Sequence, residues 1–157
     1  MSTSRVEVPD WSHLAAYEGC GHVDAYRTDV PQNVALADYA EAFFSTPVFR
    51  LERSILGVFG AGTDDGQVTA LAQGHSDAMA AWVVEARSDR DLLLEAGGGV
   101  IRTWLGVEPT QSGTTLYFGS AVLNGRGGKP PLAARVLMPF HHLYSRTLLA
   151  LAARTLR

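Results

Sequence analysis

The densest group of charge in the second half of the chain lies on segments that alternate apolar and polar residues. It comprises Glu85, Arg87, Glu95 and Arg102. Glutamates and arginines enclosed in a cavity can orient a polar head group, and a buried glutamate with a raised pKa can act as a general base. The alternation favours a simpler interpretation: a solvent-facing ladder of cross-strand ion pairs, each contributing about 0.2–1 kcal/mol.

Two adjacent histidines near the C-terminus invite a metal or catalytic interpretation. Neighbouring helix residues point about 100° apart, so we do not expect His141 and His142 to face one site. Their spacing places His141 beside Tyr144 at the edge of an apolar stripe, where the two could hydrogen-bond a ligand. His142 aligns with Arg146 on the outer side. Since neither ring has a visible partner, packed or half-exposed histidines are the ordinary interpretation.

The first half offers a second group of potentially reactive side chains. Cys20, the only cysteine, is one glycine away from His22. A Cys–His nucleophile also needs an orienting group and an oxyanion site, and the sequence holds no Gly-x-Ser-x-Gly elbow. His13, Cys20, His22 and His75 do not match a standard zinc spacing. We therefore predict no metal site and no cofactor.

The elements that position these side chains follow from hydrophobic periodicity. Residues 1–21 form an arm or a short helix, with Trp11, Leu14 and Tyr17 at helical spacing, and 22–157 form one domain. A first strand covers 22–30. Helical spacing then predicts a helix over about 36–44 with Asn33 as its N-cap. A second helix opens at Pro47, and its spacing predicts a buried side of Val48, Leu51, Ile55 and Val58 or Phe59. A third short helix is capped at 63–65 and ends at Gly74.

From about residue 78 the period changes to two, which predicts four strands at 79–87, 92–96, 100–108 and 114–123. Their short connections make consecutive strands antiparallel neighbours. A tight turn at Gly98-Gly99 would place Glu95 opposite Arg102. One face then carries Trp82, Val84, Ala86, Leu92, Leu94, Ala96, Ile101, Leu105 and Val107, and the other carries Glu85, Arg87, Glu95, Arg102 and Trp104.

The apolar face needs a cover, which we assign to a long C-terminal helix that follows the Gly-rich loop 124–131. Pro139 suits its first turn. Its apolar stripe consists of Phe140, Leu143, Tyr144, Leu148, Leu151 and Ala152. The fold class is therefore α+β: a curved antiparallel sheet wrapped on a long C-terminal helix, with two or three short helices after the first strand.

Composition limits the classes of partner. The 157 residues are 46% apolar and carry a net charge of −3, which gives no electrostatic reason to bind nucleic acid. All acids precede residue 109, so the last third is purely basic, which complements a helix dipole or meets an anionic membrane surface. The N-terminus lacks an apolar signal core and no stretch is long enough to span a membrane, so we expect a cytoplasmic location.

Several segments together resemble a bacterial family of the START-like superfamily, which is also called SRPBCC or polyketide cyclase-like. They are Tyr39-Ala40-Glu41-Ala42-Phe43-Phe44, Ala81-Trp82-Val83-Val84-Glu85-Ala86, Arg102-Thr103-Trp104-Leu105, Leu116-Tyr117-Phe118-Gly119-Ser120-Ala121 and Phe140-His141-His142-Leu143-Tyr144-Ser145-Arg146. The resemblance covers roughly residues 22 to 156. It implies a helix-grip fold with a cavity between the sheet and the long helix. About five strands are expected here, fewer than a complete helix-grip sheet has.

Three functions remain open from the sequence. The first is binding of a small apolar or amphipathic molecule without catalysis, with Tyr144, His141, Arg102, Trp104 and Glu85 as ligand-binding candidates. The second is a cyclase or dehydratase type of enzyme that uses the same cavity and an inward-facing acid or base. The third is a module that docks on a membrane or a protein through its basic last helix.

Overall fold

The computed structural model describes residues 2–58, 62–79, 81–96, 98–125 and 132–156, and inside the helices it describes the side chains except those of 52, 53, 55–58 and 132–139. The elements in chain order are β1 (Ser4–Val6), the 3-10 helix η1 (His13–Tyr17), β2 (Gly21–Val30), α1 (Leu36–Phe44), α2 (Pro47–Val58), α3 (Asp65–Ala72), β3 (Ala78–Met79), β4 (Trp82–Arg87), β5 (Asp91–Ala96), β6 (Ile101–Thr110), β7 (Gly113–Leu123) and α4 (Leu132–Thr155). The molecule is thus α+β, with a C-terminal helix and three helices after its first long strand, as the sequence predicted.

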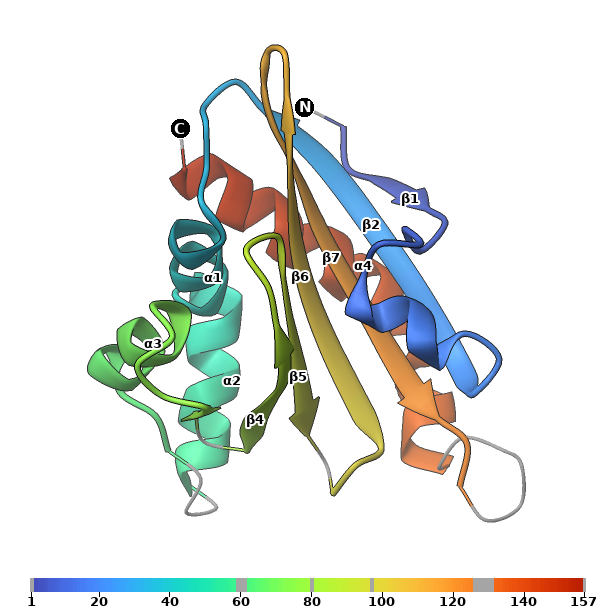
Figure 1. The fold of residues 1–157 in the computed structure, drawn as a ribbon. Helices are drawn as coiled ribbons and strands as arrows, with labels where there is room; N and C mark the ends of the chain where they lie inside the picture. Colours follow the sequence, from blue (N-terminus) through green and yellow to red (C-terminus); the bar gives the residue numbers. More distant parts are fainter. Residues whose placement is uncertain (1, 59–61, 80, 97, 126–131, 157) are drawn as a thin grey trace.

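Within the described residues, one antiparallel sheet of seven strands forms the centre of the molecule, in the order β1-β2-β7-β6-β5-β4-β3 (Figure 1). The expectation of about five strands was too low. The arm contributes β1, which pairs with β2, and the strand predicted at 79–87 is divided into β3 and β4. Both additional strands lie at sheet edges and have only two or three residues, which is too short to produce a period-two pattern.

The predicted register of the β5–β6 hairpin is confirmed, with Glu95 opposite Arg102 and Leu94 opposite Thr103. Gly98 and Gly99 both have positive φ in the turn, a conformation that favours glycine. Side chains opposite one another project from the same face of a sheet. The charged pair therefore lies on the face opposite Leu94.

A β-bulge corrects the sorting of faces in β4. Val84 pairs with Leu94, but Ala86 pairs with Leu93, so one residue is inserted at Glu85. The insertion reverses the faces beyond it. Ala86 consequently packs on the side opposite the main core. Arg87 moves away from Glu85 and donates hydrogen bonds to the carbonyl oxygens of Leu71 and Ala72 at the end of α3.

The three short helices begin and end for identifiable reasons. Asp64 caps α3 by accepting from the Gln67 N–H, and the Gln67 side-chain oxygen in turn accepts from the Asp64 N–H. This is the cap predicted at 63–65. The predicted N-cap of α1 was wrong. Ala35 occupies that position without a side-chain hydrogen bond, and Asn33 lies before it. In α2, Leu51 is exposed rather than buried, while the predicted core positions Ile55, Val58 and Phe59 lie outside the described side chains.

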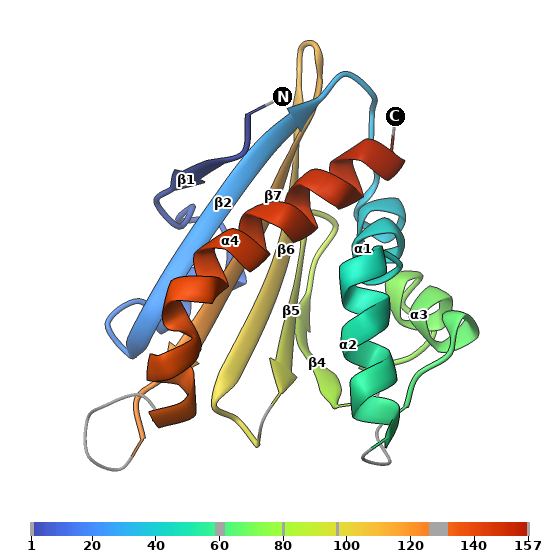
Figure 2. The same ribbon diagram turned by 180° about the vertical axis from the view of Figure 1, so that it is seen from behind.

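The long helix α4 lies diagonally across one face of the sheet and packs against α1 (Figure 2). It starts at Leu132, so Pro139 lies inside it and not in its first turn. Its buried face is also rotated from the predicted stripe: Phe140 and Leu143 are each 69% exposed. The residues that face the core are Ser145, Leu148, Leu149, Ala152 and Ala153. None of the helices in the described residues is long and apolar enough to cross a membrane.

The opposite face of the sheet is covered by the N-terminal arm, which the sequence left undecided. Leu14 of η1 packs on Trp104 and Tyr117 in a second apolar cluster. Glycine at position 119 permits this contact, because a Cβ there would lie 2.5 Å from Leu14 Cδ2 and 2.9 Å from Trp104 Cε3. The arm is tied to the sheet by Asp91, whose carboxylate accepts from the His13 N–H at 2.8 Å.

Candidate functional site

A cavity of about 430 Å³ lies between the sheet and α4. Its volume falls within the range of roughly 300–1,000 Å³ that is typical of small-molecule sites. Four aromatic side chains from four different elements supply much of the wall: Phe43, Phe49, Trp82 and Phe118. Ala96, Ile101, Val122, Phe140 and Leu148 extend the apolar surface, and Thr103, Ser120, His141 and Tyr144 supply its polar atoms.

The polar end of the cavity continues into a buried carboxylate. His141 Nε2 lies 2.9 Å from Ser120 Oγ and 3.2 Å from Oδ2 of Asp24. Ser120 also donates to Asp24 Oδ1 at 3.0 Å. The Asp24 side chain is 0% exposed, whereas His141 reaches the cavity wall. His141 therefore connects the cavity with an acid that no ligand in the cavity would contact directly.

Two further histidines approach the same carboxylate. His22 Nε2 lies 3.2 Å from Asp24 Oδ2, and His142 Nδ1 lies 3.6 Å from it. Burial by itself would raise the pKa of Asp24, but the hydrogen bond and charge of His141, with hydrogen bonds from His22 and Ser120, outweigh burial and hold the pKa below its ordinary value. Asp24 is thus an ionised acid at neutral pH, inside the fold.

The contacts among Ser120, His141 and Asp24 differ from those of a serine nucleophile. In a catalytic triad, the serine and the acid contact opposite ring nitrogens of the histidine. Here both approach Nε2 of His141, and Ser120 directs its own proton to Asp24. This geometry suits the orientation of a ligand or a proton transfer by His141, and it does not activate Ser120.

The five ligand-binding candidates from the sequence divide between the two faces of the sheet. His141 and Tyr144 line the cavity. Glu85, Arg102 and Trp104 lie on the other face, beneath the N-terminal arm. Strand alternation places them there, because each belongs to the face opposite Leu94 and Leu105. Glu95, the other acid considered as a general base, pairs with Arg102 and shares that face.

Glu85 and Arg102 form a structural ion pair rather than a head-group site. Nε and Nη2 of Arg102 donate to the two carboxylate oxygens at 3.1 and 3.2 Å, and the Tyr17 hydroxyl donates to the same carboxylate at 2.6 Å. Burial acts to raise the pKa of Glu85, but the Tyr17 and Arg102 bonds outweigh it and lower the pKa. A carboxylate with a lowered pKa is a poor general base.

His22, Asp24 and His142 also form a possible metal-ligand set, although the sequence predicted none. Their ligand atoms all lie within 4.8 Å of one another. The sequence pattern placed His142 on the outer side because it misassigned the buried stripe of α4. The actual buried face is centred on Ser145 and Leu149, and its two sides bring His141 and His142 to Asp24. The signal available in the sequence was His22-x-Asp24, whose two side chains share one face of a strand.

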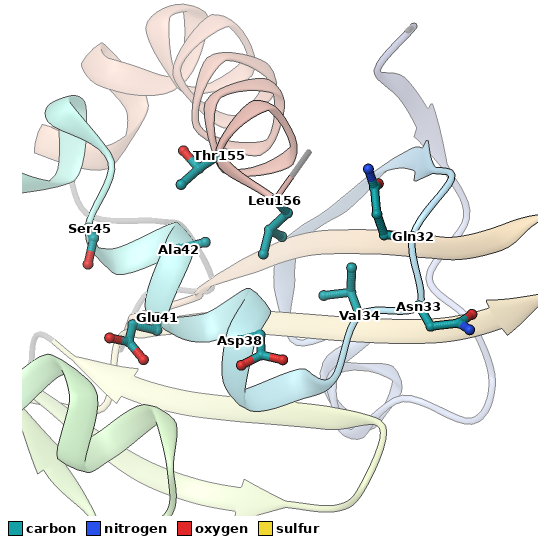
Figure 3. A pocket seen from close by; sticks show the side chains of 9 residues that line it. All are labelled: Gln32, Asn33, Val34, Asp38, Glu41, Ala42, Ser45, Thr155 and Leu156. Atoms are coloured by element: carbon teal, nitrogen blue, oxygen red, sulfur yellow. The ribbon is translucent and has the colours of Figure 1, made fainter.

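A second hollow of about 540 Å³ lies between α1 and the end of α4 (Figure 3). Its charged side chains are Asp38, which is exposed, and Glu41, which accepts a hydrogen bond from Thr69. Its described lining holds neither histidine nor arginine. Nor does its described lining include an aromatic side chain, whereas aromatic rings form much of the wall of the cavity beneath α4.

Comparison with known proteins adds no identification, because no family model, curated protein or solved structure matches this chain.

Proposed function

We propose that this chain is a START-like helix-grip domain that binds a small apolar or amphipathic molecule between its sheet and α4. The observation that carries the proposal is the cavity beneath α4, which has aromatic walls and ends in a polar group formed by Ser120 and His141. Apolar walls with a few converging polar groups are the usual composition of a ligand site. The ligand inferred is a mainly hydrocarbon molecule with one hydrogen-bonding group.

The polar end favours one orientation of that ligand. Its hydrogen-bonding group would lie against His141 and Ser120, because the remaining cavity wall offers mainly apolar atoms.

Native mass spectrometry followed by denaturing extraction tests the proposal directly. A small molecule that travels with the protein at near-unit stoichiometry is expected, and its identification would give its chemical class. A clean apo mass, together with no saturable binding of a fluorescent apolar probe, would contradict the proposal.

Filling the cavity provides the matched mutational test. Val122→Trp places a large ring where a cavity-lining valine stands, and we expect it to weaken probe binding at least about 10-fold, which corresponds to about 1.4 kcal/mol. Probe fluorescence titration measures the change. Val83→Trp is the control: Val83 is 51% exposed and shares the opposite face with Glu95. Equal losses of probe affinity in both variants would show that the probe does not bind in this cavity.

One observation supports an enzyme of the cyclase or dehydratase type as the second candidate. His141 lines the cavity while its Nε2 contacts the Asp24 carboxylate, and a histidine positioned by an acid can transfer protons. Turnover of the extracted ligand, lost in His141→Gln with binding retained, would distinguish this enzyme from a carrier. Docking of α4 on a membrane stays a prediction, which salt-sensitive binding to anionic liposomes would test.

A further inference from the structure

A group of nitrogen and oxygen ligand atoms converges beside the cavity, from two positions on β2 and one on α4. We propose that His22, Asp24 and His142 form a binding site for one divalent transition-metal ion, of which Zn²⁺ is the best fit. The inference does not depend on the cavity having a ligand, since it rests on protein atoms outside the apolar wall.

Two of the three distances between the ligand atoms match a coordination site, and all three atoms lie within 4.8 Å of one another. Metal–ligand bonds of about 2.0–2.2 Å place tetrahedral ligand atoms about 3.3–3.6 Å apart. Asp24 Oδ2 lies 3.2 Å from His22 Nε2 and 3.6 Å from His142 Nδ1. An ion could therefore bind with small side-chain movements and no rearrangement of the strands.

The surroundings of Asp24 resemble those of a metal-ligating carboxylate. Ser120 donates to Oδ1 at 3.0 Å, which fixes the carboxylate and directs Oδ2 toward His22 and His142. His141 Nε2 lies within 3.3 Å of both oxygens. It is a neighbour able to steady the acid.

Ligand chemistry selects the class of ion. Two imidazoles with one carboxylate suit Zn²⁺ and the neighbouring transition metals, while Ca²⁺ and Mg²⁺ prefer oxygen ligands throughout. Three protein ligands also leave a coordination position open. The Tyr26 hydroxyl lies 2.5 Å from His142 Nδ1, so it would be displaced from that nitrogen and would remain beside the ion.

The experiment titrates Zn²⁺ alone into the 157-residue chain, purified without a polyhistidine tag and stripped with chelator. Calorimetry is expected to give one ion per chain, and Co²⁺ should develop visible ligand-field bands. His22→Ala and His142→Ala should each weaken binding by about 100-fold or more, because loss of an outer-shell partner alone costs about 10–100-fold. Ser120→Ala removes only such an outer-shell partner and should weaken binding by about 10–100-fold.

The control is His75→Ala, which removes an exposed histidine far along the chain from the site and should leave the affinity unchanged. Circular dichroism of each metal-free variant checks folding. His142 also contacts Tyr26, so His22→Ala, at a residue outside that bond, decides the test if His142→Ala does not fold. Absence of one-to-one binding to the parent, or equal losses in His22→Ala and His75→Ala, would overturn the proposal.

Discussion

Leu148→Asp is expected to abolish folding or to lower the free energy of unfolding by more than about 4 kcal/mol. Leu148 is 1% exposed and belongs to the main core between α4 and the sheet. An aspartate there would bury an unpaired charge and remove the packing of a leucine. Urea denaturation followed by circular dichroism measures the loss.

The same substitution five residues earlier on the same helix is the matched control. Leu143 lies on α4 and is 69% exposed, so Leu143→Asp should change the free energy of unfolding by no more than about 0.5 kcal/mol. A variant Leu148→Asp that melts like the parent, or a Leu143→Asp that loses as much, would show that α4 covers the sheet with a different face.

Asp91→Ala should produce the second large effect, a loss of about 2–4 kcal/mol in the free energy of unfolding. The Asp91 carboxylate is 1% exposed and accepts from Trp104 Nε1 at 3.0 Å, from the His13 N–H at 2.8 Å and from Ser88 Oγ at 2.5 Å. Its removal leaves the fully buried Trp104 N–H without this acceptor and loosens η1. Hydrogen exchange at residues 13–17 should accelerate along with the drop in urea midpoint.

Asp89→Ala is the control for this test, because Asp89 is an exposed acid in the same β4–β5 connection. It should leave the free energy of unfolding within about 0.5 kcal/mol of the parent value. If the two alanine variants lost the same free energy of unfolding, the attachment of the arm through Asp91 would not contribute to stability.

The contribution of Asp91 should also depend on pH in a defined direction. Burial alone would raise the pKa of Asp91, but hydrogen bonds from Ser88, His13 and Trp104 outweigh it, so the folded-state pKa lies below the ordinary value of 3.8. The contribution is complete above that ordinary value and is lost as the pH falls through the folded-state pKa. The gap in stability between the parent and Asp91→Ala should therefore narrow below about pH 4, and a gap that widened on acidification would contradict this assignment.

The long elements were predictable because their local signals agree with their tertiary role. Period-two alternation located β5, β6 and β7, and the register of Glu95 with Arg102 followed from the turn glycines. The Asp64 cap of α3 was equally visible. Where a local sequence pattern also agrees with packing in the core, the element predicted from the sequence is the one observed.

The candidate site was less predictable, because it depends on rotations and insertions that carry no local signal. A bulge at Glu85 changed the face of Arg87, and a shift of the buried stripe on α4 brought His142 inward. Asp24 stands between Val23 and Ala25, where alternation alone would place the acid toward solvent, yet α4 covers that side of β2, so the acid is buried. A helix that packs on the nominally polar side of a strand reverses the usual inference from alternation.

The pairing of β2 with β7 has a consequence for how the chain folds. Gly21 aligns with Leu123 and Val30 with Thr114, so the strand pairs that are farthest apart in the sequence join its first and last thirds. Closing such distant segments is slow, because the chain loses loop entropy before those contacts form. On the ribosome, β2 would emerge long before its partner strand, and the buried acid and the cavity could form only when synthesis is nearly complete.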